Sequence, residues 1–171
     1  PRPVSSAASD VYKRQRFDRR QIMLIIRNKP LTLVNIGYVG HMWELYAMWA
    51  WILMFAQFSQ QYFVDFPFGT PEYFCFVVVA VGAIGCIAGG LLSDIFGRCY
   101  TTATLMIISG TCAFLIGFLV EGPPLIFAII ALLWGMTIIA DSGQFSAAVT
   151  ELSDSHLVGT ALTAQMALGL R

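Results

Sequence analysis

Five long apolar runs, separated by short polar turns, leave this chain few possible folds. The hydrocarbon core of a bilayer is about 30 Å thick, and about 20 apolar residues in a helix cross it. Lipid offers backbone groups no hydrogen-bond partners, so such runs form helices. Only 12% of the residues are charged, against about 25% in a soluble domain. The sequence therefore predicts an all-α polytopic membrane protein, with helices at about 33–55, 74–92, 102–120 and 124–148 and a truncated fifth at 157–171.

The two ends of the chain differ from this domain at 33–171. Residues 1–15 are polar and show no periodicity, and we interpret them as an artefactual linker. Residues 16–32 carry five basic side chains around a short amphipathic stretch, as in a segment that lies against lipid headgroups. The fifth run holds too few residues to cross a bilayer, so we expect the chain to be truncated there.

Basic residues predict the orientation. Segments 16–32 and 93–101 contain basic residues, whereas the loops at about 57–72 and 121–123 contain no Lys or Arg. Short cytoplasmic loops are enriched in Lys and Arg. We therefore expect a multi-pass protein of the plasma or inner membrane, with 16–32 and 93–101 in the cytoplasm.

Residues 89–98, Gly-Gly-Leu-Leu-Ser-Asp-Ile-Phe-Gly-Arg, form a charged turn between the second and third runs. The turn resembles the loop signature of the major facilitator superfamily, a Gly-x-Leu-x-Asp-(basic)-x-Gly-Arg-(basic) pattern. Ile95 and Cys99 depart from that pattern, since the family prefers basic residues there. The matching residues are Gly90, Leu92, Asp94, Gly97 and Arg98.

Three of these residues suggest how the turn works. Gly97 permits a tight reversal with positive φ. Asp94 and Arg98 can pair across the turn, and such contacts can exist in one conformation and break in another. The alternative is an ordinary loop with a solvated charge pair.

The second run also carries Gly82, Gly85 and Gly89 near one another on a helix. Small residues let helices approach closely in lipid, so we predict a packing face. Glycine is also common in membrane helices generally, and this remains the alternative.

Ionisable residues inside membrane helices are costly and are often functional. His41 and Glu44 lie near the middle of the first run and share a helix face, with Tyr38 on its flank. Residues 35–49 resemble the seventh helix of bacterial major facilitator transporters. Glu44 could instead be a packing contact neutralised by His41.

The fourth run has a polar stripe that includes Trp134, Thr137, Asp141 and Gln144. Residues 141–152 resemble the tenth helix of the same transporters. In that family the seventh and tenth helices line the central cavity, so the resemblance assigns these side chains to a substrate and proton pathway. Asp141 could instead be solvated at the cytoplasmic interface, and Trp134 could be a lipid anchor.

The resemblance implies the C-terminal half of a twelve-helix transporter that moves a small solute by alternating access. Its expected partners are membrane lipid, the missing N-terminal half, a small-molecule substrate and a proton. The resemblance favours an organic acid or an inorganic anion as substrate. The rival interpretation is a non-transporting membrane scaffold that associates through its glycine-rich faces.

Other classes fit less well. The net charge is zero, which argues against a nucleic-acid partner. The four cysteines are scattered, without a Cys-x-x-Cys motif, so we expect no metal or cofactor. An enzyme is not expected, because catalytic pairs with convincing spacing are lacking.

Overall fold

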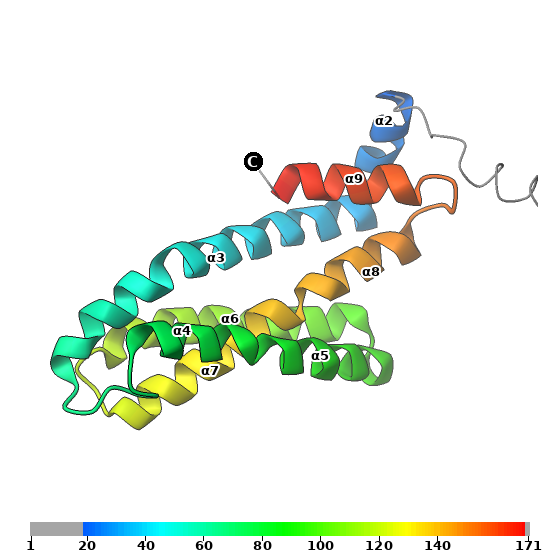
Figure 1. Cartoon of the computed structure of the whole chain (residues 1–171). Coiled ribbons are helices and arrows are strands. Elements are labelled where there is room, and N and C mark those ends of the chain that lie inside the picture. The colour runs from blue at the N-terminus through cyan, green and yellow to red at the C-terminus, as the bar shows by residue number, and fades with distance from the viewer. Residues whose placement is uncertain (1–18, 170–171) are drawn as a thin grey trace, which may run out of the picture.

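The computed structural model describes residues 19–169, and every regular element in this range is helical. This confirms the prediction of an all-α chain for these residues. The predicted linker at 1–15 lies outside the described residues, as do the first residues of the basic segment. The helices, drawn in Figure 1, are α2 (Arg19–Arg27), α3 (Lys29–Ser59), η1 (Gln60–Tyr62), α4 (Pro71–Ala80), α5 (Gly82–Phe96), α6 (Arg98–Ile116), η2 (Gly117–Leu119), α7 (Pro124–Ala140), α8 (Ser142–Leu152) and α9 (Val158–Gly169).

Three helical stretches are long and apolar enough to cross a membrane: Pro71–Phe96, Arg98–Leu119 and Pro124–Leu152. They contain the second, third and fourth predicted spans. Their lengths of 26, 22 and 29 residues meet the requirement of about 20 residues for a bilayer. The chain is therefore indicated to be membrane-embedded.

The first predicted span lies within α3, which is not among these three stretches. With 31 residues α3 is long enough, but it is less apolar than the others. His41 and Glu44 lower its hydropathy, as do the tryptophan and tyrosine residues around them. The expectation of four full spans therefore counted one helix more than length and composition support. α9 has 12 residues, fewer than a bilayer crossing needs.

Two predicted single helices are each divided in the structure. The second run is interrupted at Val81, between α4 and α5, and the fourth at Asp141, between α7 and α8. A sequence average over a long apolar run does not reveal such breaks. Val77, Val78 and Val79 precede the first break and Gly82 follows it, and β-branched residues and glycine are weak helix formers.

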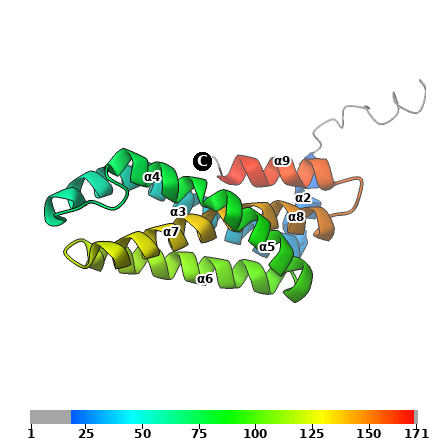
Figure 2. The same cartoon turned by 60° about the horizontal axis from the view of Figure 1, so that its bottom comes forward.

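Helix α7 packs against both α5 and α6, and α3 lies against α8, α4 and α9. Figure 2 shows α7 running beside α6, with α4 on its other side. The end of the described chain returns to α3, because Gly169 lies against Tyr38 and Met42. This arrangement sets the polar face of α3 opposite α7 and α8.

An aromatic cluster holds the connection between α3 and α4 on the bundle. The Phe127 ring on α7 is stacked on Phe74 at 5.4 Å and meets Phe63 edge-on at 5.2 Å. Phe66 also packs against Phe74. Aromatic pairs at such spacings stabilise a core. Residues 63–66, which the sequence assigned to a loop, are thus attached to the end of α7.

Large apolar side chains cover the outside of the bundle. Trp43, Ile107 and Leu125 are each about 70% exposed or more. Soluble monomers rarely expose continuous apolar patches of this kind. A lipid environment gives these side chains a suitable solvent, in agreement with the three spanning stretches.

Candidate functional site

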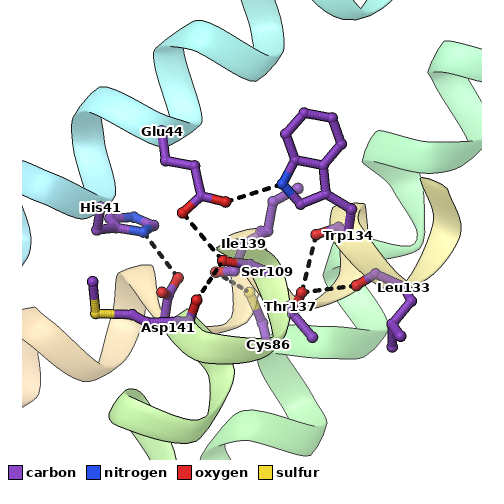
Figure 3. A network of polar contacts seen from close by, with 10 residues as sticks. His41, Glu44, Cys86, Ser109, Leu133, Trp134, Thr137, Ile139 and Asp141 are labelled. Atoms are coloured by element: carbon purple, nitrogen blue, oxygen red, sulfur yellow. Dashed lines mark hydrogen bonds and ion pairs between the residues drawn. The ribbon is translucent and has the colours of Figure 1, made fainter. Parts of the chain in front are cut away.

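A polar network lies between α3 and the α7–α8 stretch, near the middle of the bundle (Figure 3). Helix α3 begins with a local signal: the Asn28 side chain caps it by accepting a hydrogen bond from the Leu31 N–H at 3.3 Å, and Pro30 lies in its first turn. From this start α3 presents His41 and Glu44, one turn apart, toward α6 and α7.

The most buried part of the network is the contact between His41 and Asp141. The His41 Nδ1 atom lies 3.0 Å from Asp141 Oδ1, and each side chain is only 1% exposed. The angles do not fit a hydrogen bond, and among the described residues neither side chain has another hydrogen-bond partner. A buried ion pair needs such additional partners to offset its desolvation. The two side chains are therefore close enough for a strong electrostatic interaction, but no hydrogen bond from the described residues supports the contact.

Asp141 lies at the break between α7 and α8. Its carbonyl oxygen accepts hydrogen bonds from the N–H groups of Gln144 (3.0 Å) and Phe145 (3.3 Å), which restart the helix. Two residues earlier, the Ile139 carbonyl accepts a hydrogen bond from the Cys86 thiol at 3.5 Å. Breaks in membrane helices are tolerated where neighbours satisfy the freed backbone groups. The break sets the Asp141 carboxylate against α3.

Glu44 has two hydrogen-bond donors. The Trp134 indole N–H donates to Oε1 at 3.0 Å, and the Ser109 hydroxyl lies 3.2 Å from Oε2. Ser109 is fully buried on α6, and Glu44 is half-buried. Charge-assisted hydrogen bonds to a carboxylate are stronger than neutral ones. Glu44 thus joins α3 to both α6 and α7.

One alternative from the sequence is that His41 neutralises Glu44. In the structure His41 instead approaches Asp141, and Glu44 is engaged by Trp134 and Ser109. Trp134 is accordingly a hydrogen-bond donor inside the bundle rather than a lipid anchor. Asp141 is buried rather than solvated at an interface, because α3 covers it.

Aromatic rings cover the imidazole. The ring centroids of His41 and Phe145 are 5.5 Å apart, and Tyr38 lies 6.2 Å from His41 and 5.8 Å from Phe145. Tyr38 is itself buried. These rings shield the His41–Asp141 contact from one side, which lowers the local polarity and strengthens the electrostatic interaction there.

Two residues of the predicted stripe have other roles. The Thr137 hydroxyl is buried and lies within hydrogen-bond distance of two carbonyl oxygens of its own helix, those of Leu133 (2.8 Å) and Trp134 (3.2 Å). The Gln144 side-chain oxygen accepts a hydrogen bond from Arg98 at 3.2 Å. Thr137 is thus satisfied locally, whereas Gln144 connects the stripe to the charged turn.

The charged turn is attached to α8. Gly97 has a φ of 86°, as a tight turn requires. Arg98 Nε donates to Glu151 Oε1 at 2.6 Å, with the two side chains 31% and 56% exposed. Asp94 is exposed, and it forms no ion pair with any side chain of residues 23–169. Arg98 therefore pairs with α8 and not across the turn with Asp94.

The three glycines of the second run lie against α7. An added Cβ would come within 2.0 Å of the Met136 carbonyl oxygen at Gly85 and within 2.2 Å of Ile139 at Gly82. At Gly89 it would lie 3.2 Å from the Ala140 carbonyl oxygen. Gly90, by contrast, has open space around it. The close approach of α5 and α7 keeps the α7–α8 break in position.

A separate groove of about 540 Å³ lies between α2, α3 and α9. It is almost wholly apolar, and its lining includes Asn35, whose side-chain oxygen is buried without a hydrogen-bond partner among the described residues. None of His41, Glu44 and Asp141 lines this groove. The polar network is thus closed on this side in the present conformation.

Ser109 and Glu151 were not singled out as site residues by sequence reasoning. Ser109 is one of several small polar residues in an apolar run, and only its contact with Glu44, 65 positions away, distinguishes it. Glu151 lies just beyond the predicted span at 124–148 and reads as a solvated charge, although the structure places it in the last turn of α8. Within residues 19–169, no group of three or more His, Cys, Asp or Glu side chains is arranged to hold a metal ion.

Comparisons with known proteins found no matching family model, no matching curated protein and no matching solved structure.

Proposed function

We propose that this chain is part of a secondary active transporter that moves a small solute across a membrane by alternating access, coupled to protons. We further propose that it forms the C-terminal half of a twelve-helix transporter of the major facilitator superfamily. The observation that carries the proposal is the buried constellation of His41, Glu44 and Asp141 between α3 and α7–α8. Ionisable groups at such depth are expensive to bury and mark ion or substrate pathways.

The His41–Asp141 contact has no hydrogen bonds to stabilise it, and this favours a second conformation in which the contact is broken. A contact with unsatisfied polar atoms on both partners loses little when α3 and α8 separate and water reaches both groups. Closure then expels that water again. An equilibrium between two such states is what alternating access requires.

The proton is assigned to Glu44, as the mid-helix acid, and the His41–Asp141 contact to closure of the pathway. When the contact opens, the His41 imidazole becomes available as a hydrogen-bond donor to an anionic solute within the network. This supports a small organic acid or an inorganic anion as substrate. Arg98 is engaged by Glu151 and Gln144 at the edge of the network.

The charged turn is proposed to respond to the conformational change. The bonds of Arg98 to Glu151 and Gln144 join the start of α6 to α8. Asp94 projects from the same turn without an ion pair in the described part of the chain. It is therefore available to contact the other half of the transporter in one of its two states.

The membrane is proposed to be the plasma or inner membrane, with the charged turn and α2 on the cytoplasmic side. The basic residues Arg27, Lys29 and Arg98 lie on that side, and every charged residue in the loops at the other end is acidic.

The scaffold interpretation receives less support. It relied on glycine-rich faces for association with other proteins, but Gly82, Gly85 and Gly89 are occupied by α7 within the chain itself. A scaffold also gives no reason for burying Asp141 and His41 with unsatisfied atoms.

The experiment is solute-dependent proton movement in liposomes that contain the full-length protein carrying this chain. A pH-sensitive dye inside the liposomes reports proton flux when small organic acids or inorganic anions are added outside. We expect at least one such solute to give a flux that protein-free liposomes lack. Glu44→Gln should abolish the flux, and Glu72→Gln, an exposed acid at the start of α4, should leave it intact. A flux that is equal in both variants would contradict the proposal.

A further inference from the structure

The hydroxyl of Ser109 has two possible acceptors. It lies 3.2 Å from Glu44 Oε2 on the neighbouring helix and 3.3 Å from the Met106 carbonyl oxygen one turn earlier in α6. A serine hydroxyl has a single hydrogen, so it donates to one acceptor at a time, while its oxygen can also accept. Ser109 is fully buried, with 0% of its surface exposed. Its hydrogen therefore points either to Glu44 or to Met106.

Trp134 determines which oxygen of Glu44 can carry a proton. The indole N–H lies 3.0 Å from Oε1, and an indole nitrogen donates but does not accept. Oε1 must therefore remain an acceptor in both protonation states. A carbonyl oxygen accepts more strongly than a hydroxyl oxygen, so a proton on Glu44 is favoured on Oε2, which faces an acceptor in Ser109.

We propose that Ser109 is a hydroxyl switch that satisfies both protonation states of Glu44 without movement of any non-hydrogen atom. When Glu44 is ionised, the Ser109 hydroxyl donates to Oε2. When Glu44 is protonated, the Oε2 hydroxyl donates to Ser109, which turns its own hydrogen to the Met106 carbonyl. The inference rests on the proposed function, since it identifies the residue that serves the proton site.

The proton balance of the switch is simple. Protonation transfers one proton from a hydronium ion to Glu44 Oε2 and leaves a water molecule, and release is the reverse. No covalent bond of Ser109 is made or broken, because only the direction of its O–H bond changes. Water reaches the half-buried Glu44 when α3 moves away from α7, and the enclosed hydroxyl replaces that water after closure.

Other ionisable groups face Glu44 from the packed helices. His41 is one turn away on α3, Asp141 lies at the α7–α8 break, and Cys112 follows Ser109 on α6. α5 contributes the Cys86 thiol, which bonds to the Ile139 carbonyl. None of these groups is hydrogen-bonded to Glu44, whose partners among the described residues are Ser109 and Trp134. Ser109 and Trp134 are thus positioning residues for the proton on Glu44.

The test is infrared difference spectroscopy of the full-length protein in liposomes across pH. Glu44→Gln identifies the carboxylic acid band of Glu44 by its disappearance. Ser109→Ala removes a charge-assisted donor from the ionised form and a weaker neutral acceptor from the protonated form. We expect the midpoint pH of the band to rise by about 1 unit in Ser109→Ala.

Ser109→Thr keeps the hydroxyl, so its midpoint should match the unmodified protein, and Ser109→Cys, with a weaker donor, should lie between. Thr111→Ala is the matched control, because the Thr111 hydroxyl is exposed and bonds to its own helix at Ile107. A Ser109→Ala midpoint equal to that of Thr111→Ala would overturn the switch. So would the absence of any band that Glu44→Gln removes.

The spectroscopic result is separable from the proposed function. If the band moves as expected but no solute drives proton flux, the transport proposal fails and the switch stands. If proton flux depends on Glu44 while Ser109→Ala leaves the midpoint pH of the band unchanged, the switch fails and the transport proposal stands.

Discussion

Glu44 and Asp141 are acids of one network in very different surroundings. Glu44 has two hydrogen-bond donors on other helices, whereas the Asp141 carboxylate has only the His41 imidazole at 3.0 Å and accepts no hydrogen bond from any described residue. A buried carboxylate that accepts hydrogen bonds is stabilised by them. A buried carboxylate without hydrogen bonds is stabilised only while an oppositely charged or polar group stays beside it. In the proposed transporter these surroundings would suit the two residues to different tasks, proton binding at Glu44 and closure at Asp141.

The first prediction concerns the His41–Asp141 contact. Asp141→Leu should destabilise the protein by about 3–5 kcal/mol, because it leaves the buried imidazole facing an apolar group. The double variant His41→Phe/Asp141→Leu should recover most of this loss, since apolar pairs often replace buried ion pairs without cost. Denaturant unfolding in detergent measures both. A double variant as unstable as the sum of its two single variants would contradict the poor support inferred for this contact.

A second prediction concerns the donors of Glu44. Trp134→Phe keeps the ring and removes the N–H that reaches Oε1, which should cost about 1–3 kcal/mol. Trp43→Phe is the control, because Trp43 is on α3 as Glu44 is, but is 77% exposed. Its effect should stay within about 0.5 kcal/mol. Equal losses for the two variants would mean that the indole bond to Glu44 carries no stability.

At the scale of helices, the site depends on how closely α5 meets α7. Met136, Ile139 and Ala140 of α7 touch the glycines of α5 just before the break at Asp141. Gly135 makes the reverse contact, since a Cβ there would lie 2.1 Å from the Val78 carbonyl oxygen of α4. These contacts set the position of Asp141 relative to α3.

A third prediction compares two glycines of α5. Gly85→Ala places a methyl group against the Met136 backbone and should destabilise the protein by at least about 1–3 kcal/mol. Gly90→Ala enters open space and should be neutral or stabilising, because alanine is the better helix former. Thermal unfolding in detergent distinguishes them. If both variants unfold alike, the close approach of α5 and α7 is not what limits stability.

Sequence patterns predicted the helices better than their breaks and partners. Apolar runs predicted where α3 to α9 lie, because length and hydropathy are local properties. The contact between His41 and Asp141 joins residues 100 positions apart, which no local pattern contains. Ser109 shows the same limit, since only the packing of α6 against α3 brings it to Glu44.

For the whole molecule, the distribution of charge predicts how the bundle lies in the membrane. Asp65 and Glu121 lie in the connections at the end of the bundle held by the Phe127 cluster, and Arg98 and Glu151 pair at the far end of α6 and α8. Only the second end carries basic residues in its turn. We therefore propose, from the positive-inside rule, that this end faces the cytoplasm.

The fourth prediction tests this orientation. In a cysteine-free full-length protein, single cysteines at Asp65 and Glu121 should react with an impermeant thiol reagent added to intact cells. A cysteine at Ser155, exposed in the turn after α8, should react only after the cells are opened. Reaction of the Ser155 position from outside would reverse the assignment.

The most direct test of the account is whether Glu44 couples a proton to the solute. Glu44→Gln preserves the shape of the side chain and removes its titration. In liposomes containing the full-length variant, we expect solute accumulation under an imposed pH gradient to disappear, while exchange of labelled for unlabelled solute continues. Accumulation in Glu44→Gln liposomes at the level of the unmodified protein would contradict the account.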